Sequence, residues 1–577
     1  MKLRDSRRLT GPNILWQRAS AVIDVALEPD EPTTTLIDAW QRHARTILEA
    51  IDWSTEELAH RVFASGVSLA ISAPIDALYA ATEVNEWAFE ATVAELKGQP
   101  HPALEEAAQR VRQMIAKERN PAVLAMQAAA AEHRVAFLWD DDAISVGMGS
   151  GSRCWPSDAI PDPQGVDWRN VHDIPVAMIT GTNGKTTTVR LLASMARAAG
   201  LEPGVSSTDG CWVAGEEIGE GDYSGPGGAR LVLRDPRVDI ALLETARGGM
   251  LRRGLGVERA DVAIITNVAE DHLGEWGVHD LDELVETKFI VEKGTRRLVL
   301  NADDPKLSSR PDRRGLRRVW FGCDHDALVV QANVETGDMT TVLEGDELVL
   351  HDHGGREVVA RLDQVPMTLG GAARHNVYNA LGAICVALRL GLPLAAVREG
   401  LASFDSSAEE NPGRLNRFDL GGVQAIVDFA HNPHGLEALL EMGRALPAKR
   451  RLVLVGQAGD REDEAIRELP RMVWKTHPDR VILKELVKNL RGRELGEVPA
   501  LMADEFLRLG AAEGTLERAA NELAAVVQAL RWAKPGDLLL LITHEERARV
   551  LDYVKQLAQA DWRPGDDLPA IDDDSSS

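Results

Sequence analysis

The chain has 577 residues, of which 44% are hydrophobic and 27% charged, and 64 Lys and Arg against 90 Asp and Glu give a formal net charge of −26. This composition is typical of a globular protein with about three or four domains, and it excludes a disordered or fibrous chain. The acidic balance argues against nucleic acid and anionic membranes as partners, so an anionic substrate would need a local basic pocket.

The cysteines and the N-terminal residues indicate the cellular compartment that we expect for the protein. Cys154, Cys211, Cys323 and Cys385 are far apart and form no CxxC pair, which favours neither a disulfide framework nor structural zinc. The basic start "MKLRDSRRLTGPN" has no apolar segment behind it, and no run reaches the roughly 18 apolar residues of a membrane span. We therefore expect a protein of the reducing cytoplasm, without a membrane segment.

Residues 1–135 predict an N-terminal α+β domain. The stretch "NILWQRASAVIDVAL" resembles a strand, and three later segments carry apolar residues at helical i, i+3, i+4 spacing. Thr or Ser start signals precede two of these segments. The predicted helices are "PTTTLIDAWQRHARTILEAI", "STEELAHRVFASG" and "PALEEAAQRVRQMIAKE". Residues 136–173 are rich in Gly, Ser, Pro and Asp, and they predict a linker or a short hairpin.

Residues 174–412 predict a central α/β domain. Its short apolar strands show no alternation of polar and apolar residues, as expected for a parallel sheet covered on both faces. These strands are "PVAMIT", "VDIALLET", "ADVAIITN", "RRLVLN" and "RRVWFG", and the helix "NVYNALGAICVALRLG" follows them.

Residues 413–563 predict a second, smaller α/β domain, because the alternation of strands and helices starts again. Its strands are "GGVQAIVDFA", "KRRLVLVG", "DRVILK" and "GDLLLLIT". Residues 564–577 are acidic and predict a disordered tail.

The loop "TGTNGKTTT" indicates a triphosphate site. Gly181 and Gly184 allow the backbone to form a nest of N–H groups, and the positive end of the following helix adds to it. Lys185 would reach the β- and γ-phosphates, and the Thr186 hydroxyl would hold Mg²⁺. The alternative is an ordinary glycine turn before a helix.

Two further strands end on groups that can bind a metal ion. "VDIALLET" leads to Glu244, like a Walker-B acid, and "ADVAIITN" ends on Asn267, with Asp271 and His272 after it. Taken singly, Glu244 could cap a turn, and His272 could be a hydrogen-bonded surface residue. Ligands of open α/β sheets gather at the carboxyl ends of strands, which favours the metal-site interpretation.

These motifs carry a family resemblance. "TGTNGKTTT", "TNVAEDHLG", "LVLNADDP" and "VDFAHNPHGLEALL", in this order, resemble the Mur ligase superfamily of ATP-dependent acid–amine ligases. The segment from "SSTDGCWVAGEEIGEGDYSG" to "ETARGGMLRRGLG" is similar to one branch, the Mur-like half of the cyanophycin synthetases. The similarity runs from about Pro175 to Arg549. It implies a Mur-ligase-like central P-loop ATPase domain and a C-terminal Rossmann-like α/β domain.

The resemblance also implies site residues. ATP would contact the loop and a few residues beyond it, namely Gly181, Thr182, Asn183, Gly184, Lys185, Thr186, Thr187, Asn301, Arg414, Asp428 and His431. Mg²⁺ would bind Thr186, Glu244 and His272, together with Lys288 if that lysine is carbamoylated, as in many family members; otherwise Lys288 is a surface lysine in a salt bridge. The catalytic set would be Lys185, Glu244, His272 and Lys288.

The resemblance further implies an amide or isopeptide ligase that acts through an acyl phosphate and releases ADP. In the cyanophycin branch this half joins arginine to an aspartate carboxylate. From charge we expect Asp209 and Asp222 to bind such an amine, and Ser224 and Arg247 to contact the substrates. The carboxylates of an aspartate polymer would suit Arg247, Arg252 or Arg253. Each of these residues could equally shape a turn or cap a helix.

The segment before the loop departs from that branch. Cyanophycin synthetases carry an ATP-grasp domain of some two hundred residues before the Mur-like half, and there is no room for one between "AISVGMGSGSRCW" and the P-loop strand. The chain could add a residue to a backbone made by a separate ATP-grasp synthetase, or join small amino-acid or peptide substrates. The alternatives are a non-catalytic subunit that binds ATP and polymer, and a ligase of the cell-wall or folate type. A homo-oligomer also stays open.

Overall fold

The computed structural model describes residues 1–28, 31–312 and 314–570. By internal contacts the chain divides into two compact units, which are described separately. The first contains Met1–Val359 and Tyr378–Gly400, and the second contains Ala360–Val377 and the chain from Leu401 onward. Among the described residues no helix is long and apolar enough to cross a membrane.

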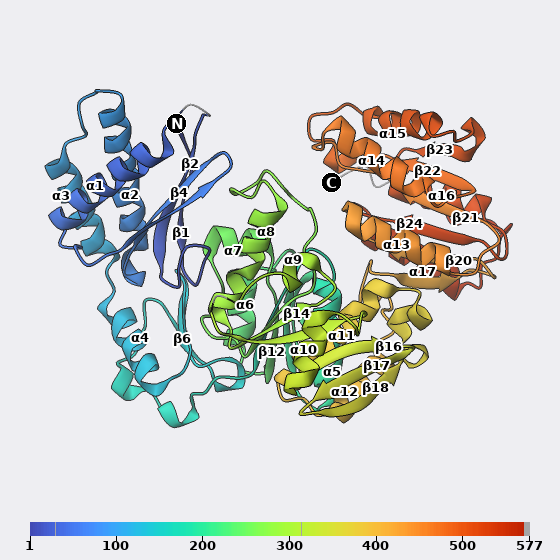
Figure 1. The fold of residues 1–577 in the computed structure, drawn as a ribbon, viewed down its shortest axis with the longest axis horizontal. Coiled ribbons are helices and arrows are strands. Elements are labelled where there is room, and N and C mark those ends of the chain that lie inside the picture. Colours follow the sequence, from blue (N-terminus) through green and yellow to red (C-terminus); the bar gives the residue numbers. More distant parts are fainter. Residues whose placement is uncertain (29–30, 313, 571–577) are drawn as a thin grey trace. The chain divides into compact units, whose positions relative to one another are not determined.

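The N-terminal domain is an antiparallel sheet with helices packed on it (Figure 1). The strand order is β1-β2-β4-β3, and the core contains Ile23, Trp40 and Leu69. The strands are β1 (Lys2–Leu9), β2 (Ser20–Ala26), β3 (Leu58–Phe63) and β4 (Gly66–Ser72), and the helices are α1 (Thr33–Ala50), α2 (Leu78–Leu96), α3 (Leu104–Glu118) and α4 (Pro121–His133). The predicted helices at 32–51 and 102–118 are confirmed as α1 and α3.

Two predictions in this domain are wrong. The segment 54–66 is not a helix, because its residues 58–63 form β3, which pairs antiparallel with β4 from Leu58↔Ile71 to Phe63↔Gly66. In the structure the exposure of its side chains alternates along most of the strand, which is the period of a strand and not of a helix. The long strand expected at 13–27 begins only at Ser20, because the Asn13 side chain accepts hydrogen bonds from Leu15 N and Trp16 N and forms a turn.

The segment before the P-loop strand contains the hairpin that the sequence left open. Three short antiparallel strands follow one another, β5 (Phe137–Trp139), β6 (Ala143–Val146) and β7 (Arg153–Pro156). Two 3-10 turns, η3 (Pro163–Gly165) and η4 (Trp168–Asn170), then lead directly to the first strand of the central sheet.

The central domain is built on a mixed sheet with the strand order β11-β10-β9-β12-β8-β13-β14-β15-β16-β17-β18. The strands from β9 to β16 run parallel, as the apolar runs predicted, and antiparallel hairpins extend both ends of the order. The strands are β8 (Val176–Thr180), β9 (Pro203–Ser207), β10 (Gly210–Val213), β11 (Glu216–Gly219), β12 (Ile240–Glu244), β13 (Val262–Ile265), β14 (Arg297–Asn301), β15 (Arg317–Gly322), β16 (Thr340–Glu344), β17 (Glu347–Asp352) and β18 (Gly355–Arg361).

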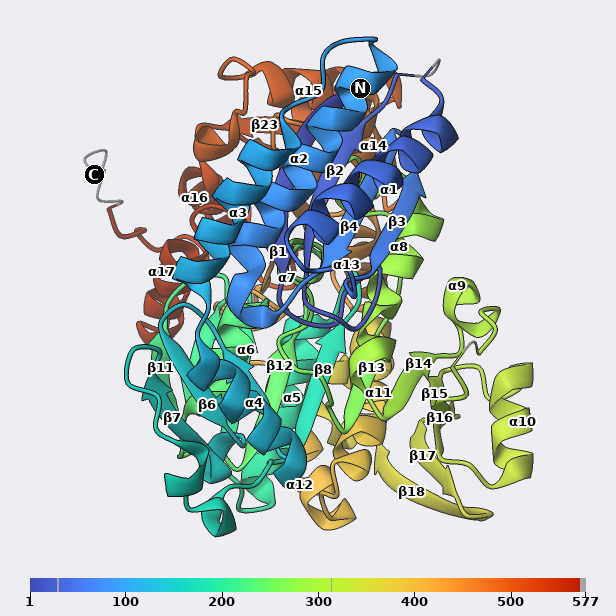
Figure 2. The same ribbon diagram turned by 90° about the vertical axis from the view of Figure 1, so that its left-hand side faces the viewer.

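Helices cover this sheet, and Figure 2 shows α5 and α6 against its parallel strands. Apolar residues of α6, α7 and α8 pack on one face through side chains such as Val232, Met250 and Leu284. The helices are α5 (Lys185–Ala198), α6 (Pro226–Arg234), α7 (Arg247–Arg253), α8 (Leu281–Lys288), α9 (Pro305–Ser308), α10 (Leu328–Thr336), α11 (Arg374–Arg389) and α12 (Leu394–Ser403), with the 3-10 helix η5 (Phe289–Gly294) after α8.

The second unit contains a further α/β sheet with the strand order β19-β20-β24-β21-β22-β23. All pairs are parallel except β19 with β20, and two separate apolar clusters fill the two faces. The strands are β19 (Asn416–Asp419), β20 (Gln424–Asp428), β21 (Arg451–Val455), β22 (Arg480–Lys484), β23 (Leu516–Ala519) and β24 (Leu538–Ile542), and the helices are α13 (Pro433–Ala445), α14 (Asp463–Trp474), α15 (Glu497–Arg508), α16 (Glu522–Trp532) and α17 (Arg547–Gln559). The last part of the predicted tail, 571–577, lies outside the described residues.

Candidate active site

The P-loop joins β8 to α5, and its backbone requires glycine at two positions. Gly181 and Gly184 have φ angles of 146° and 85°, a region that L side chains rarely adopt. A Cβ atom on Gly181 would lie 1.9 Å from Thr266 Oγ1, and one on Gly184 would lie 2.2 Å from Asn379 Oδ1. The loop is therefore packed tightly against the end of β13 and against α11.

Residues at the end of β13 fix the conformation of this loop. Thr182 N donates to Asn267 O and Asn183 N to Asn267 Oδ1, both at 3.0 Å. The Thr266 hydroxyl donates to Asn183 O at 2.6 Å. Because these two N–H groups are used within the protein, phosphate binding would fall to the first turn of α5, where N–H groups point out of the helix end.

Glu244 lies at the end of β12 and is bonded to two hydroxyl groups. Thr186 Oγ1 donates to Glu244 Oε2 at 2.8 Å, and Thr208 Oγ1 donates to Glu244 Oε1 at 2.6 Å. Glu244 is only 2% exposed. A carboxylate next to a hydroxyl at the first turn of a P-loop helix is an oxygen donor set of the kind that Mg²⁺ prefers. The residues therefore fit the expected Mg²⁺.

Two lysines bind backbone carbonyls of the same loop. Lys185 Nζ donates to Thr182 O at 2.9 Å, and Lys288 Nζ donates to Gly181 O at 2.8 Å. Lys288 is 4% exposed, so it is not the surface lysine of the alternative interpretation. Burial, with the positive charge of Lys185 as the next cause, holds the pKa of Lys288 well below its ordinary value. Burial therefore favours the unprotonated amine.

His272 lies in the loop after β13, and its backbone is unusual. It has a φ of 50°, uncommon outside glycine, and its half-exposed side chain has Nε2 3.8 Å from Asp271 Oδ1. Such residues concentrate at functional sites, because they cost free energy that the rest of the fold must supply. Its role as a metal ligand stays a prediction.

Asn301 ends β14 and is buried, and its amide bridges two backbone segments. Its Nδ2 donates to Thr266 O at 3.1 Å, and its Oδ1 accepts from Asp303 N at 3.0 Å. These bonds hold the loop after β14 to the end of β13, which itself holds the P-loop. Contact with adenine stays a prediction for this residue.

The residues expected to bind the substrates have protein partners. Asp209 lies 3.5 Å from Arg190 Nη2, and Arg247, 9% exposed, donates to Glu275 Oε2 at 2.7 Å. Asp222 Oδ1 accepts from both the amide and the hydroxyl of Ser224, which shapes a turn before α6. Asp222 and Ser224 thus have the turn-shaping contacts that the sequence offered as an alternative, and their contact with substrate stays a prediction.

Arg414, Asp428 and His431 belong to the second unit and gather around one aromatic ring. The guanidinium group of Arg414 lies 4.7 Å from the centre of the Phe429 ring, and the His431 ring lies 5.1 Å from it. Asp428 accepts hydrogen bonds from Leu415 N and Ala430 N. Desolvation raises the pKa of Asp428, although Arg414 acts in the opposite direction. These three residues therefore form a compact polar group at the end of β20.

Three contacts around the loop were not predicted. Thr208 donates to Glu244, Thr266 donates to the loop, and Asn379 packs against Gly184. Thr208 follows β9 and Thr266 follows β13, so the rule that polar groups gather at the carboxyl ends of parallel strands could have found both. Asn379 lies within α11, and no local signal in the sequence marks it.

The sequence of this chain matches two family models and several known proteins. The Mur ligase middle domain matches residues 179–387, and the Mur ligase, glutamate ligase domain matches residues 413–543. Cyanophycin synthetase from Trichormus variabilis is 34% identical over 385 residues, which are 66% of this chain and 42% of that protein. The chain thus matches less than half the length of that relative.

Relatives of lower sequence identity include a second kind of ligase. The UDP-N-acetylmuramoyl-L-alanyl-D-glutamate–2,6-diaminopimelate ligase of Clostridium botulinum is 28% identical over 301 residues, 50% of this chain and 57% of that protein. Among solved structures, E. coli FolC in complex with ADP gives a TM-score of 0.48 at 21% identity, covering 67% of this chain and 89% of that chain. The two domain matches together span more than half of the sequence. The chain therefore belongs to the Mur ligase family.

Proposed function

We propose that this protein is an ATP-dependent ligase that joins a carboxylate to an amine and releases ADP and phosphate. The observation that carries the proposal is the pairing of Thr186 with Glu244 beside a loop whose carbonyls bind Lys185 and the buried Lys288. Membership of the Mur ligase family and the similarity to cyanophycin synthetase support it.

The chemistry has two steps. A carboxylate oxygen of the acid attacks the γ-phosphorus of ATP, the bond to the β-phosphate oxygen breaks, and ADP leaves an acyl phosphate behind. The amine then attacks the acyl carbon, phosphate departs with the bonding electrons, and the amine loses a proton to give the amide. Lys185 and the N-terminus of α5 would bind the phosphoryl oxygens and offset the charge that develops on them.

Thr186, Glu244 and His272 would hold Mg²⁺, which when bound screens the negative charge of the phosphates. The lowered pKa of Lys288 favours its unprotonated amine, and this is the nucleophilic form that can combine with CO₂. The resulting carbamate would add a carboxylate beside the loop. This role of Lys288 is part of the proposal.

For the substrates we propose aspartate, or a peptide that contains it, as the acid and arginine or another basic amino acid as the amine. Similarity to cyanophycin synthetase supports this choice, and the buried Arg247 offers a cation for a substrate carboxylate. The chain runs directly from β7 through two short turns into β8. We therefore propose that a separate ATP-grasp enzyme supplies any aspartate polymer that serves as the acid.

The test is phosphate release from ATP in the presence of Mg²⁺, screened over pairs of amino acids and short aspartate-containing peptides. We expect one or more pairs to stimulate release, and Lys185→Ala and Glu244→Gln to abolish the stimulated rate. Lys306→Ala and Glu216→Gln are matched controls, because both residues are surface members of ion pairs away from the loop. If no pair stimulates phosphate release, the ligase proposal fails, and the result favours a non-catalytic subunit that binds ATP and polymer. Stimulation only by cell-wall or folate precursors would move the assignment to those ligases.

A further inference from the structure

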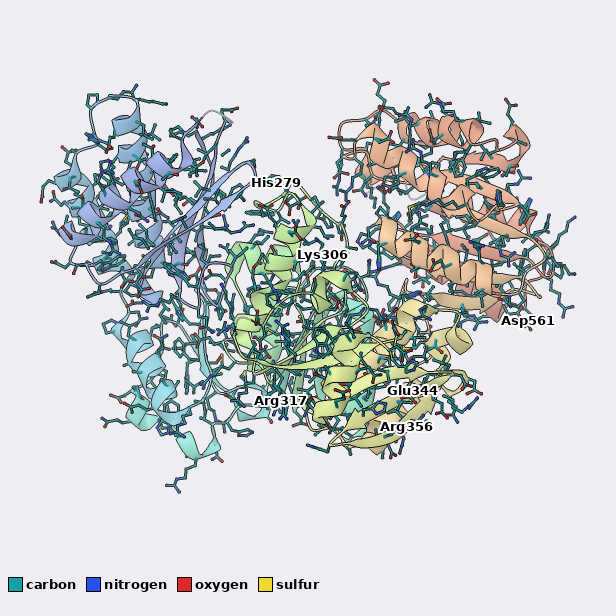
Figure 3. All side chains as sticks on the ribbon, viewed as in Figure 1. His279, Lys306, Arg317, Glu344, Arg356 and Asp561 are labelled. Atoms are coloured by element: carbon teal, nitrogen blue, oxygen red, sulfur yellow. The ribbon has the colours of Figure 1, made fainter. Side chains whose placement is uncertain are left out.

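The N-terminal domain contacts the central domain at the elements that carry the proposed substrate side of the site. These contacts reach α7, which begins with Arg247, the segment 271–279, which contains His272 and Glu275, and α8, which ends with Lys288. Figure 3 labels His279 at the end of this segment beside the N-terminal sheet, and Figure 2 shows α8 next to β3.

The hairpin of β3 and β4 holds the far end of the 271–279 segment. Arg61 Nη2 donates to Gly277 O at 2.9 Å, and Ser65 Oγ lies 2.8 Å from His279 Nε2. The rings of Phe63 and His279 stack with centres 6.0 Å apart. Arg61 is largely buried, so its bond to Gly277 is shielded from water. The hairpin therefore contacts this segment through the Gly277 carbonyl oxygen, the His279 Nε2 atom and the face of the His279 ring.

Strand β1 holds the same segment from a second side. The guanidinium groups of Arg7 and Arg252 each lie 5.5 Å from the centre of the Trp276 ring. Arg7 Nε also donates to Leu251 O at 3.0 Å, near the end of α7. Arg7 is fixed by Asp24 on β2, so the position of the Trp276 ring depends on the N-terminal sheet.

The chain after β1 secures the ends of α7 and η5. Thr10 N donates to Arg253 O at 2.9 Å, and Leu255 N donates to Pro12 O at 2.7 Å. Lys293 Nζ donates to Asn13 O and Ile14 O at 2.7 and 2.8 Å. These bonds fix the C-terminal end of α7, which begins with Arg247, and that of η5, which directly follows Lys288.

The segment needs this support, because its backbone is strained. His272 and Trp276 have φ angles of 50° and 56°, a left-handed conformation that is unfavourable for residues other than glycine. Such a conformation persists only where the surroundings over-determine it. Here Trp276 is held by Arg7 and Gly277 by Arg61, both from the N-terminal domain.

We propose that the N-terminal domain is a working part of the ligase site, in which Arg7 and Arg61 are positioning residues for the 271–279 segment. By holding this segment they keep Glu275 against Arg247, the cation offered to the acid substrate. The proposal rests on the proposed function for its link to substrate. The effect of Arg7 and Arg61 on the conformation of the segment does not depend on substrate binding and can be measured separately.

Hydrogen exchange tests the hold. The amides of Gly274 and Val278 bond to Val278 O and Glu275 O within the segment, so their exchange reports its opening. In Arg61→Met we expect amide exchange in 271–279 to rise about tenfold while exchange in the P-loop peptide 180–187 stays unchanged. The double variant Phe63→Ala/Ser65→Ala should give the same pattern if Arg61→Met does not fold. Arg42→Met, which removes an exposed ion pair between α1 and α2, is the matched control.

Kinetics then test the link to substrate. With the acid and amine found by the screen, Arg61→Met should raise the KM of the acid about tenfold and leave the KM of ATP within about twofold of wild type. Unchanged exchange in both hairpin variants would overturn the hold, and raised exchange with an unchanged KM of the acid would overturn the positioning role. If the wild-type protein turns over no pair, the proposed function fails, and the exchange comparison alone decides whether the N-terminal domain holds the segment.

Discussion

At the scale of single residues, Lys288 shows how burial changes the chemistry of a side chain. Its amine is enclosed between the P-loop and the end of α8, and it donates to Gly181 O instead of to a carboxylate. Desolvation disfavours its charged form, so its pKa is lowered. The family resemblance identified this lysine by its spacing after His272. Its burial, in contrast, results from the packing of α8 against the loop.

The first prediction concerns pH and Lys288. Because the pKa of this amine in the folded state lies below the ordinary lysine value of 10.5, the unfolded state binds more protons at pH values between the two. The contribution of Lys288 to stability should therefore increase as pH rises toward that value. Urea unfolding of wild type against Lys288→Met, measured from pH 7 to about 9.5, should show the stability difference shifting in favour of wild type with pH. A difference that is independent of pH would contradict the lowered pKa.

A second buried lysine, Lys484, lies at the end of β22 in the second unit. Its Nζ is bonded to Glu522, to Ile542 O at 2.7 Å and to His544 Nδ1 at 3.2 Å. The side chains of Lys484 and Glu522 are 0% and 1% exposed. Removing one partner of such a pair leaves a buried charge without compensation.

We predict that Lys484→Met lowers the free energy of unfolding of this unit by about 3–5 kcal/mol. The double variant Lys484→Met/Glu522→Gln should regain part of that loss, because it leaves no charge buried. Urea unfolding measures both, and Lys488→Met, at an exposed position nearby, should stay within about 0.5 kcal/mol of wild type. A double variant no more stable than the single one would show that the ion pair is not the source of the loss.

At the scale of elements, the parallel strands were predictable because both of their faces are covered. The strands β8, β12, β13, β14 and β15 consist mainly of apolar residues. Because these strands are parallel, the polar residues at their carboxyl ends lie at the same edge of the sheet. The strand β3 was mistaken for a helix, because its apolar residues also satisfy a helical spacing over a short stretch. Pairing with β4 decided the outcome, and no local signal contains that information.

The P-loop and α5 allow a matched test of glycine at two positions of positive φ. Gly184 and Gly200 have φ angles of 85° and 75°, but only Gly184 would bring a Cβ atom against another residue, Asn379. Gly200→Ala should therefore cost about 1 kcal/mol of stability and leave ATP binding intact. Gly184→Ala should abolish ATP binding, because the loop must shift. Calorimetric titration with ATP and Mg²⁺ checks this, and equal ATP affinity for the two variants would count against the role of the loop.

At the scale of the whole molecule, the net charge of −26 contrasts with the cations at the candidate site. Lys185, Lys288 and Arg247 lie in the elements around the P-loop. Besides burial, the positive charges of Lys185 and Arg247 both lower the pKa of Lys288. A site of this kind can select an anionic substrate on an acidic protein, because the local field depends on the nearest charges.

The last prediction is that ATP with Mg²⁺ stabilises the intact protein. A ligand that binds only the folded state adds about 2.7 kcal/mol at a concentration one hundred times its Kd. Thermal unfolding should shift upward with ATP and Mg²⁺ in wild type and in Lys306→Ala, and the shift should be lost in Lys185→Ala. The same upward shift in Lys185→Ala would place nucleotide binding elsewhere in the chain.

The sequence by itself determined the α/β class, the two sheets with apolar parallel strands, and the glycine-rich loop between a strand and a helix, because these depend on local composition and on short spacings such as "GTNGKTT". Only the tertiary structure decided that Thr208 binds Glu244, that Lys288 is buried on the loop, and that the N-terminal domain contacts the 271–279 segment. These contacts join residues far apart in the chain, and their geometry follows from the packing of whole elements.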